Sequence, residues 1–209
     1  MTGRGRNGAA ARIRLSSSNN AMSEADTLST VVTYLEMHAK PTAPTPPRPA
    51  AKIALMRAEM PPVSFYRYLY DTIGEDWLWY ERRITSNDDL TNIIHHPDVE
   101  IFVLSFGGVP AGYGELDRRA AGEVELAYFG LMPEFVGRGV GLFFLRWLVD
   151  QAWTYEPERL WVHTCDLDHP NALQVYQKAG FAPYQRETVT FTDPRTEGYF
   201  PAWRDPRPE

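Results

Sequence analysis

The sequence predicts an α/β fold, with a mixed, mostly antiparallel central sheet flanked by helices. Two observations predict it. Short apolar strand patterns alternate with helical patterns along most of the chain. In addition, the strand pattern Val124–Leu131 runs into a glycine-rich turn, after which apolar residues recur at helical spacing. Because 209 residues with 44% hydrophobic content can bury one full core, a single domain is expected over residues 29–199.

The two chain ends are expected to lie outside this domain. Residues 1–21 carry four arginines, no acidic residue and a Ser/Asn-rich run, so residues 1–28 are predicted to be a disordered extension. Met22 is a candidate for the true start of translation. Residues 200–209 are predicted to form a C-terminal tail.

Two strand patterns, two helix patterns and a proline-rich loop make up the first half of the domain. In chain order they are a strand at Val31–Met37, the loop at Pro41–Pro49, a strand at Ile53–Ala58, a helix at Val63–Ile73 and a helix at Asp88–His95 behind the candidate cap Asn87.

The second half begins with a predicted antiparallel meander. Val99–Phe106 and Ala111–Leu116 form its hairpin, and Val124–Leu131 adds a third strand. Trp161–Thr164 alternates like a strand. The helix after it would be capped by Asp168 or His169, have Pro170 in its first turn, and end at Gly180.

The turn containing Gly137, Gly139 and Gly141 has the properties of an anion-binding site. Free N–H groups at a helix start point outward and the helix dipole adds positive potential, so a phosphorylated ligand can bind without lysine. A dinucleotide fingerprint would need glycine at Leu142, and a phosphate-binding P-loop would need a lysine that this turn lacks. A purely structural turn remains the alternative.

Composition excludes several classes of function. A net charge of −6 without a basic patch argues against a nucleic-acid partner, and no apolar run is long enough for a membrane span. The single Cys165 excludes a disulfide framework; it is expected to be a buried structural thiol in a soluble, cytoplasmic protein. His163 and His169 flank two aspartates, but their spacing does not suit a metal site.

A second motif adds a family resemblance. Its members are Asn171, Ala172, Tyr176, Lys178, Gly180 and Phe181. Together with the glycine turn, they resemble the GNAT superfamily of acyl-CoA-dependent N-acyltransferases, whose signature is Arg/Gln-x-x-Gly-x-Gly/Ala followed by an Asn, Ala, Tyr, Lys and Gly-Phe pattern. The resemblance covers Glu123–Phe181. It departs at Val136, where the family usually has Gln or Arg, so only the main-chain N–H can serve there.

The resemblance implies a cleft between splayed strands that binds acetyl-CoA as a cosubstrate, with no metal. The oxyanion would meet a main-chain N–H near Leu131. The implied cofactor-binding residues are Leu131, Val136, Gly137, Arg138, Gly139, Val140, Gly141 and Asn171.

Two residues are predicted to be catalytic. Glu125 matches the position of the glutamate in lysine-acetylating members and is the candidate base, with Glu123 on the same strand face as a competitor. The alternative for Glu125 is a solvent-facing strand carboxylate. The resemblance makes Tyr176 the acid that protonates the CoA sulfur, and a core tyrosine is the alternative.

The acceptor is expected to be a small cationic amine. The segment Ser64–Arg83 is rich in aromatic residues with carboxylates among them, and Trp77, Trp79 and Tyr80 are the predicted pocket residues. The resulting hypothesis is an N-acetyltransferase that acts on a primary amine by direct attack, as a monomer or homodimer. A protein lysine or N-terminal acetyltransferase and a non-catalytic acyl-CoA sensor are the alternatives.

Overall fold

The structure is a computed structural model that describes residues 27–204. The predicted extension at 1–28 therefore lies outside the described residues except for its last two, and the predicted tail is described only to residue 204. The strands are β1 (Thr27–Met37), β2 (Ile53–Arg57), β3 (Val99–Phe106), β4 (Val109–Asp117), β5 (Glu123–Leu131), β6 (Arg159–Cys165) and β7 (Ala182–Thr192). The helices are α1 (Val63–Gly74), α2 (Glu81–Ile84), α3 (Asn87–Ile94), α4 (Gly141–Ala152) and α5 (Ala172–Ala179).

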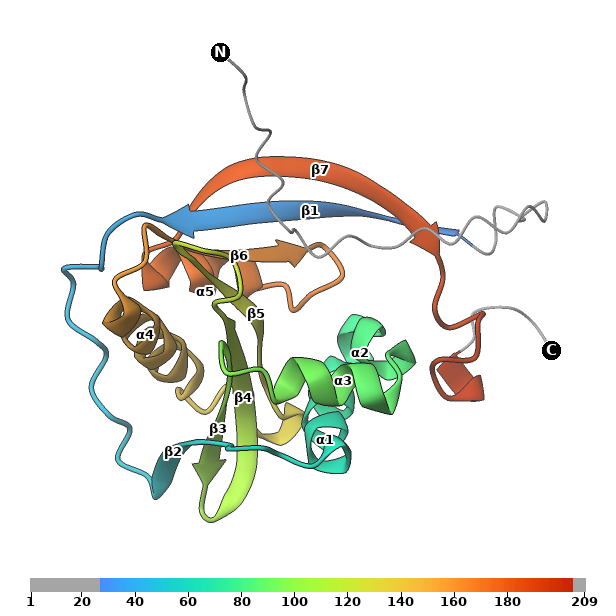
Figure 1. Cartoon of the computed structure of the whole chain (residues 1–209), viewed down its shortest axis with the longest axis horizontal. Coiled ribbons are helices and arrows are strands. Elements are labelled where there is room, and N and C mark those ends of the chain that lie inside the picture. Colours follow the sequence, from blue (N-terminus) through green and yellow to red (C-terminus); the bar gives the residue numbers. More distant parts are fainter. Residues whose placement is uncertain (1–26, 205–209) are drawn as a thin grey trace.

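The strands form one seven-stranded sheet in the order β2-β3-β4-β5-β6-β1-β7. Neighbouring strands are antiparallel except for β5 and β6, which pair in parallel. Helices α4 and α5 lie on one side of the sheet and α1, α2 and α3 on the other (Figure 1). The predicted mixed, mostly antiparallel sheet flanked by helices is therefore confirmed.

Each side of the sheet has its own apolar core. Under α4 and α5, the amphipathic helix faces bury Phe144, Leu148 and Tyr176 against the strands. On the other side, α1 and α3 bury Leu69, Ile73 and Leu90 against β3 and β4. The sheet thus separates two layers, and β5 contributes side chains to both.

A β-bulge in β5 decides which of its side chains faces which layer. Leu126 pairs with Leu116, whereas Tyr128 pairs with Glu115, so Ala127 is an extra residue. The alternation reverses there: Leu126 and Phe129 contact the core under α4, while Tyr128 contacts the core under α1. Glu125 and Tyr128 consequently lie on the same side of the sheet despite their odd spacing.

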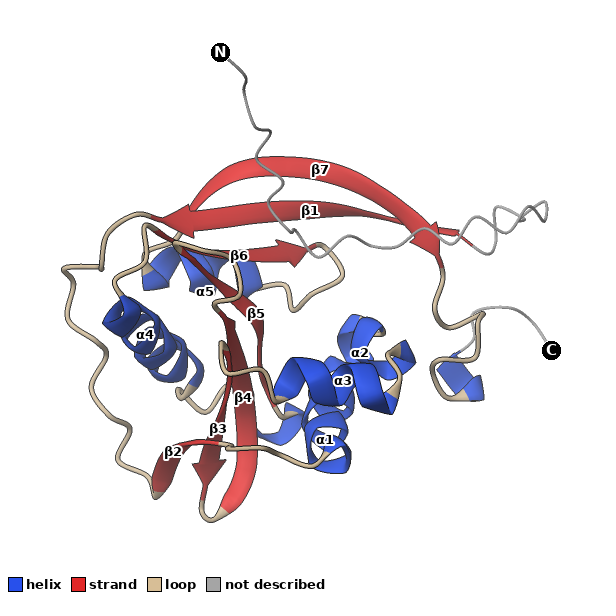
Figure 2. Ribbon diagram, in the orientation of Figure 1, coloured by secondary structure: helices blue, strands red, loops and turns tan. Residues whose placement is uncertain are grey.

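Strands β5 and β6 part soon after they pair. Their parallel register covers only Glu123–Glu125 against Arg159–Trp161, although β5 continues beside β4 as far as Leu131. Figure 2 shows the two strands running apart beyond this point. The result is a wedge-shaped opening in the sheet, with Glu125 and Trp161 at its apex.

Some local predictions were wrong. The cap of α3 is Ser86, not Asn87: the Ser86 hydroxyl oxygen accepts the Asp89 N–H at 3.1 Å. Helix α5 has Asn171 at its N-cap, so neither Asp168 nor His169 caps it and Pro170 lies before the helix. Gly180, with φ of 112°, ends α5 as predicted.

Candidate active site

The wedge between β5 and β6 contains a cavity of about 670 Å³. Its walls come from the end of β5, the glycine-rich turn, the start of α4, the loop and helix after β6, the segment that joins α1 to α2, and strands β1 and β7. Segments far apart in the sequence thus meet around one space. Such a cavity, mostly apolar with a few polar groups, is typical of a small-molecule site.

The glycine-rich turn forms one end of this cavity. Gly137 and Gly139 have φ of 79° and 75°, a conformation that disfavours other residues, and a Cβ at either position would meet nothing within 4 Å. These glycines therefore face open space rather than a packed neighbour. Gly141 begins α4, whose first N–H groups lack partners within the helix and increase the positive potential at the cavity.

Six of the eight predicted cofactor-binding residues line the cavity, namely Leu131, Val136, Gly137, Gly139, Gly141 and Asn171. Arg138 and Val140 do not. The Arg138 side chain folds back to the Glu134 carbonyl at 2.8 Å and stacks over the Phe135 ring, and Val140 is buried in the core. A role for these two residues in binding a ligand is thus confined to their main chain.

Tyr176 reaches the same cavity from α5. Its ring packs edge-on against Phe129 and Phe181 and is almost wholly buried. Burial, assisted by the negative charge of Asp168, raises the pKa of Tyr176 far above its ordinary value. The phenol carries its proton at neutral pH, as an ordinary tyrosine does, and burial makes it a weaker acid.

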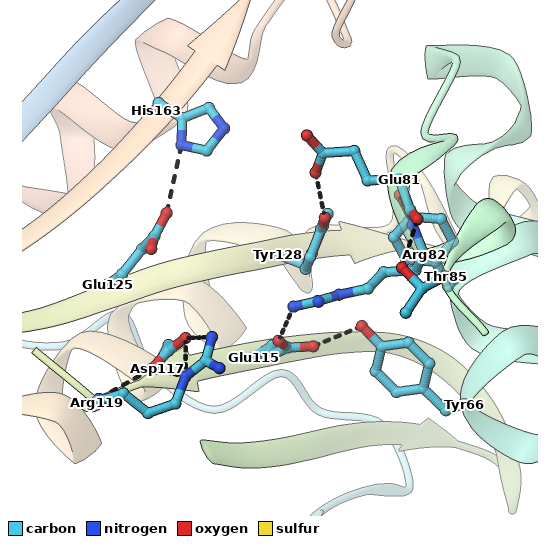
Figure 3. Close-up of polar contacts among 11 residues, drawn as sticks. Tyr66, Glu81, Arg82, Thr85, Glu115, Asp117, Arg119, Glu125, Tyr128 and His163 are labelled. Carbon is cyan, nitrogen blue, oxygen red and sulfur yellow. Dashed lines mark hydrogen bonds and ion pairs between the residues drawn. The ribbon is translucent and has the colours of Figure 1, made fainter. Parts of the chain in front are cut away.

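Glu125 does not line this main cavity. It borders a smaller adjoining pocket of about 120 Å³, and its carboxylate oxygen Oε1 is 3.5 Å from Nδ1 of His163. His163, whose spacing from the neighbouring aspartates and His169 does not suit a metal site, lines both spaces. The Glu125–His163 contact, drawn in Figure 3, was not predictable because it depends on the register between β5 and β6.

The three predicted acceptor-site aromatics line the cavity but pack differently. Trp79 contacts Tyr70, Tyr128 and the helix end at Gly74, and its indole N–H donates to Asp168 at 3.4 Å. Trp77 contacts only the His169 ring edge among the aromatic pairs of the described chain, and Tyr80 stacks on Phe191 of β7. Trp79 is therefore part of a packed cluster, whereas Trp77 is a wall residue with fewer partners.

A buried polar network supports this wall, and no sequence pattern indicates it. Glu115 is fully buried; it accepts the Tyr66 hydroxyl at 2.6 Å and Nη2 of Arg82 at 2.9 Å. Arg82 also lies over the Tyr128 ring, and the Tyr128 hydroxyl donates to Glu81 at 2.8 Å (Figure 3). The network ties α1 and α2 to β4 and β5, and it places the Glu81 carboxylate at the cavity.

Cys165 differs from its predicted role. It is only partly buried and lines the cavity, so it is not a core thiol. Burial, with the nearby charge of Asp168, raises its pKa, which keeps the sulfur in the unreactive thiol form. Within residues 27–204, no cluster of three or more His, Cys, Asp or Glu side chains is arranged to hold a metal ion. Nor does any helix in that range have the length and apolarity needed to cross a membrane.

Comparison with known proteins adds a family assignment. Residues 63–181, more than half of the chain, match the model of the acetyltransferase (GNAT) family. No curated protein matches the sequence.

Many solved structures share the fold. One is a GCN5-related N-acetyltransferase from Sphaerobacter thermophilus, with a TM-score of 0.58, 15% identity and coverage of 77% of this chain and 50% of that chain. Another is the spermidine N-acetyltransferase of Vibrio cholerae in complex with CoA and spermine, with a TM-score of 0.53, 17% identity and coverage of 68% and 96%. The chain spans 50 to 60% of the length of several of these proteins. At such identities, the similarity establishes the fold.

Proposed function

The chain belongs to the acetyltransferase (GNAT) family, and on that basis we propose that it transfers an acetyl group from acetyl-CoA to the primary amine of a small molecule by direct attack. The observation that carries the proposal is the cavity at the parting of β5 and β6, which has the open glycine turn at one end and carboxylates and aromatic rings at the other. One end suits the phosphates of CoA and the other suits an ammonium group.

The cosubstrate would lie across the wedge. Its pyrophosphate would accept hydrogen bonds from main-chain N–H groups of the turn at Gly137–Gly141, where no side chain intrudes. The thioester carbonyl would then lie near Leu131, whose N–H could stabilise the oxyanion. Tyr176, which lines the same cavity, would supply a proton to the departing sulfur.

The charges around the cavity favour a cationic acceptor. Among the described residues that line it there is no lysine or arginine, while Glu81, Asp168 and Glu187 all do so. The Glu81 carboxylate makes no ion pair within residues 27–204, although it accepts the Tyr128 hydroxyl. With Trp77 and Tyr80 beside it, an ammonium could gain both charge pairing and cation–π contact. The neighbour from Vibrio cholerae is also named for a small amine acceptor.

Binding of acetyl-CoA can be tested with matched glycine variants. At about a hundred times its dissociation constant, acetyl-CoA should stabilise the protein by roughly 2.7 kcal/mol, measured as a rise in Tm. Gly139→Asp should abolish the rise, because a side chain and a negative charge would enter the phosphate site. Gly108→Asp, in a hairpin turn with the same open surroundings and φ of 96°, should retain it. Equal ligand responses in the two variants would contradict the proposed site.

The two tryptophans should respond differently to replacement by leucine. Trp79→Leu should lower the free energy of unfolding by about 2 kcal/mol or more, since Trp79 packs in the aromatic cluster. Trp77→Leu should change the relative kcat/KM values across a set of amines, with the KM for acetyl-CoA unchanged. Urea unfolding and CoA-release assays measure these effects. Unchanged amine preference in Trp77→Leu would remove this residue from the acceptor site.

A further inference from the structure

His163 stands between Glu125 and the main cavity. Trp161, its neighbour two residues earlier on the same face of β6, is the last residue of that strand to pair with β5, and its partner is Glu125. His163 is therefore the next residue of this face beyond the apex of the wedge. Its side chain is 39% exposed and lines the main cavity, whereas the Glu125 side chain is 13% exposed and lines only the adjoining pocket.

One imidazole nitrogen of His163 contacts Glu125, and the other is available to a ligand. Nδ1 lies 3.5 Å from Oε1 of Glu125, and within the described chain no partner is found for Nε2. In Figure 3 the second ring nitrogen points away from Glu125, toward the side occupied by Glu81 and Tyr128. Because all three residues line the same cavity, an ammonium attracted to Glu81 would approach this nitrogen.

The charges around His163 suit a base that works near neutral pH. Burial disfavours the imidazolium, but the contact with Glu125 and the charges of Glu125, Glu81 and Asp168 outweigh this and raise the pKa of His163. These groups come from β5, α2 and the loop after β6. Tyr34 of β1 contacts the ring, and Arg82, Asp117 and Arg119 line the smaller pocket with it. The raised pKa makes the imidazole a stronger base than a free histidine.

We propose that His163 is the base that contacts the acceptor ammonium and removes its proton, and that Glu125 is a positioning residue behind it. The assignment rests on the proposed function and replaces the direct role predicted for Glu125. Glu125 would fix the ring orientation and the tautomer with the proton on Nδ1, so that the lone pair of Nε2 faces the cavity.

The proton and electron balance of the step is complete. Nε2 of His163 takes one proton from R–NH₃⁺, and the freed nitrogen lone pair forms the C–N bond to the thioester carbonyl carbon. When the tetrahedral intermediate collapses, the C–S bond breaks and sulfur takes a proton from Tyr176. The nitrogen loses its second proton to solvent, and Tyr176 regains a proton from solvent. His163 then releases its proton to water. The products are the amide, CoA thiol and one proton.

Three variants test whether His163 or Glu125 acts as the base. CoA release with phenethylamine, tyramine and 1,5-diaminopentane is measured from about pH 6 to pH 9 for His163→Gln, Glu125→Gln and the control His38→Gln. His38 is matched because it also pairs with a glutamate, Glu36 at 3.1 Å, but lies outside the cavity. The Tm rise with acetyl-CoA, measured for each variant, shows that folding and cosubstrate binding are intact.

The expected result is a fall of about 100-fold or more in kcat at pH 7 for His163→Gln, with a rate that rises steadily with pH because only amine that is already neutral reacts. Glu125→Gln should lose about tenfold or less. Its acid limb should move to lower pH, since the carboxylate no longer raises the pKa of His163. His38→Gln should match the wild type.

Two results would overturn the assignment. If His163→Gln keeps its rate within about threefold of wild type, His163 is not the base; if Glu125→Gln loses more than His163→Gln and also loses the acid limb, Glu125 acts directly. Both outcomes are judged from the ratio of the variant's rate to the wild-type rate. The proposed function itself is judged on the wild-type protein: failure to release CoA with any of the amines would contradict it, and this inference would fall with it.

Discussion

Replacing Tyr176 by phenylalanine is expected to lower kcat by roughly 10- to 1000-fold while leaving the Kd for acetyl-CoA nearly unchanged. The ring would keep its contacts with Phe129 and Phe181, so packing is preserved and only the hydroxyl is lost. A proton donor to sulfur is needed mainly in the transition state, which is why the effect should appear in kcat. Steady-state kinetics and isothermal titration with acetyl-CoA measure the two quantities.

Tyr68→Phe is the control for this experiment. Tyr68 lies on α1 with an exposed ring and does not line the cavity, so loss of its hydroxyl should leave both quantities unchanged. Full activity in Tyr176→Phe would mean that Tyr176 is a core residue that happens to border the cavity.

The second large effect concerns stability. Glu115→Leu should lower the free energy of unfolding by about 3 to 5 kcal/mol, because it leaves the guanidinium of Arg82 without its counter-charge in a nearly buried site. The Tyr66 hydroxyl would lose its acceptor as well. Chemical denaturation of the unliganded protein measures the loss.

A double variant tests the physical reason. Replacing both partners, as Glu115→Leu with Arg82→Met, removes the unpaired charge and should recover most of the stability. A loss of less than about 1 kcal/mol in the single variant would show that Arg82 finds another partner or reaches water. A double variant less stable than Glu115→Leu would show that the network, rather than the charge balance, holds α2 in place.

Most of the helices and strands could be predicted from the sequence. The strands at Val99–Phe106 and Val124–Leu131 and the helix that ends at Gly180 could be predicted because their signals are local: alternation, helical spacing and a glycine in a left-handed conformation. The glycine turn could be predicted for the same reason, since its glycines lie close together in the sequence.

The parts that could not be predicted depend on pairing between distant segments. The bulge at Ala127, which places Tyr128 on the face of Glu125, is a property of the β4–β5 register. The approach of His163 to Glu125 follows from the β5–β6 register. Glu115 read as an ordinary strand residue, and only the packing of α1 and α2 on β4 shows that it is buried against Arg82. No local sequence pattern predicts these contacts.

The most direct test of acetyl transfer in the wedge uses acetyl-CoA labelled with ¹³C in the acetyl carbonyl. Wild-type protein, Tyr176→Phe and Gly139→Asp are incubated with phenethylamine, tyramine, 1,5-diaminopentane and a lysine-containing peptide, and products are identified by mass spectrometry. The proposed function predicts labelled N-acetyl product from at least one small amine, one CoA thiol released per product, and strongly reduced product with both variants. Label found in the peptide alone, or acetyl-CoA binding without any labelled amide, would contradict it.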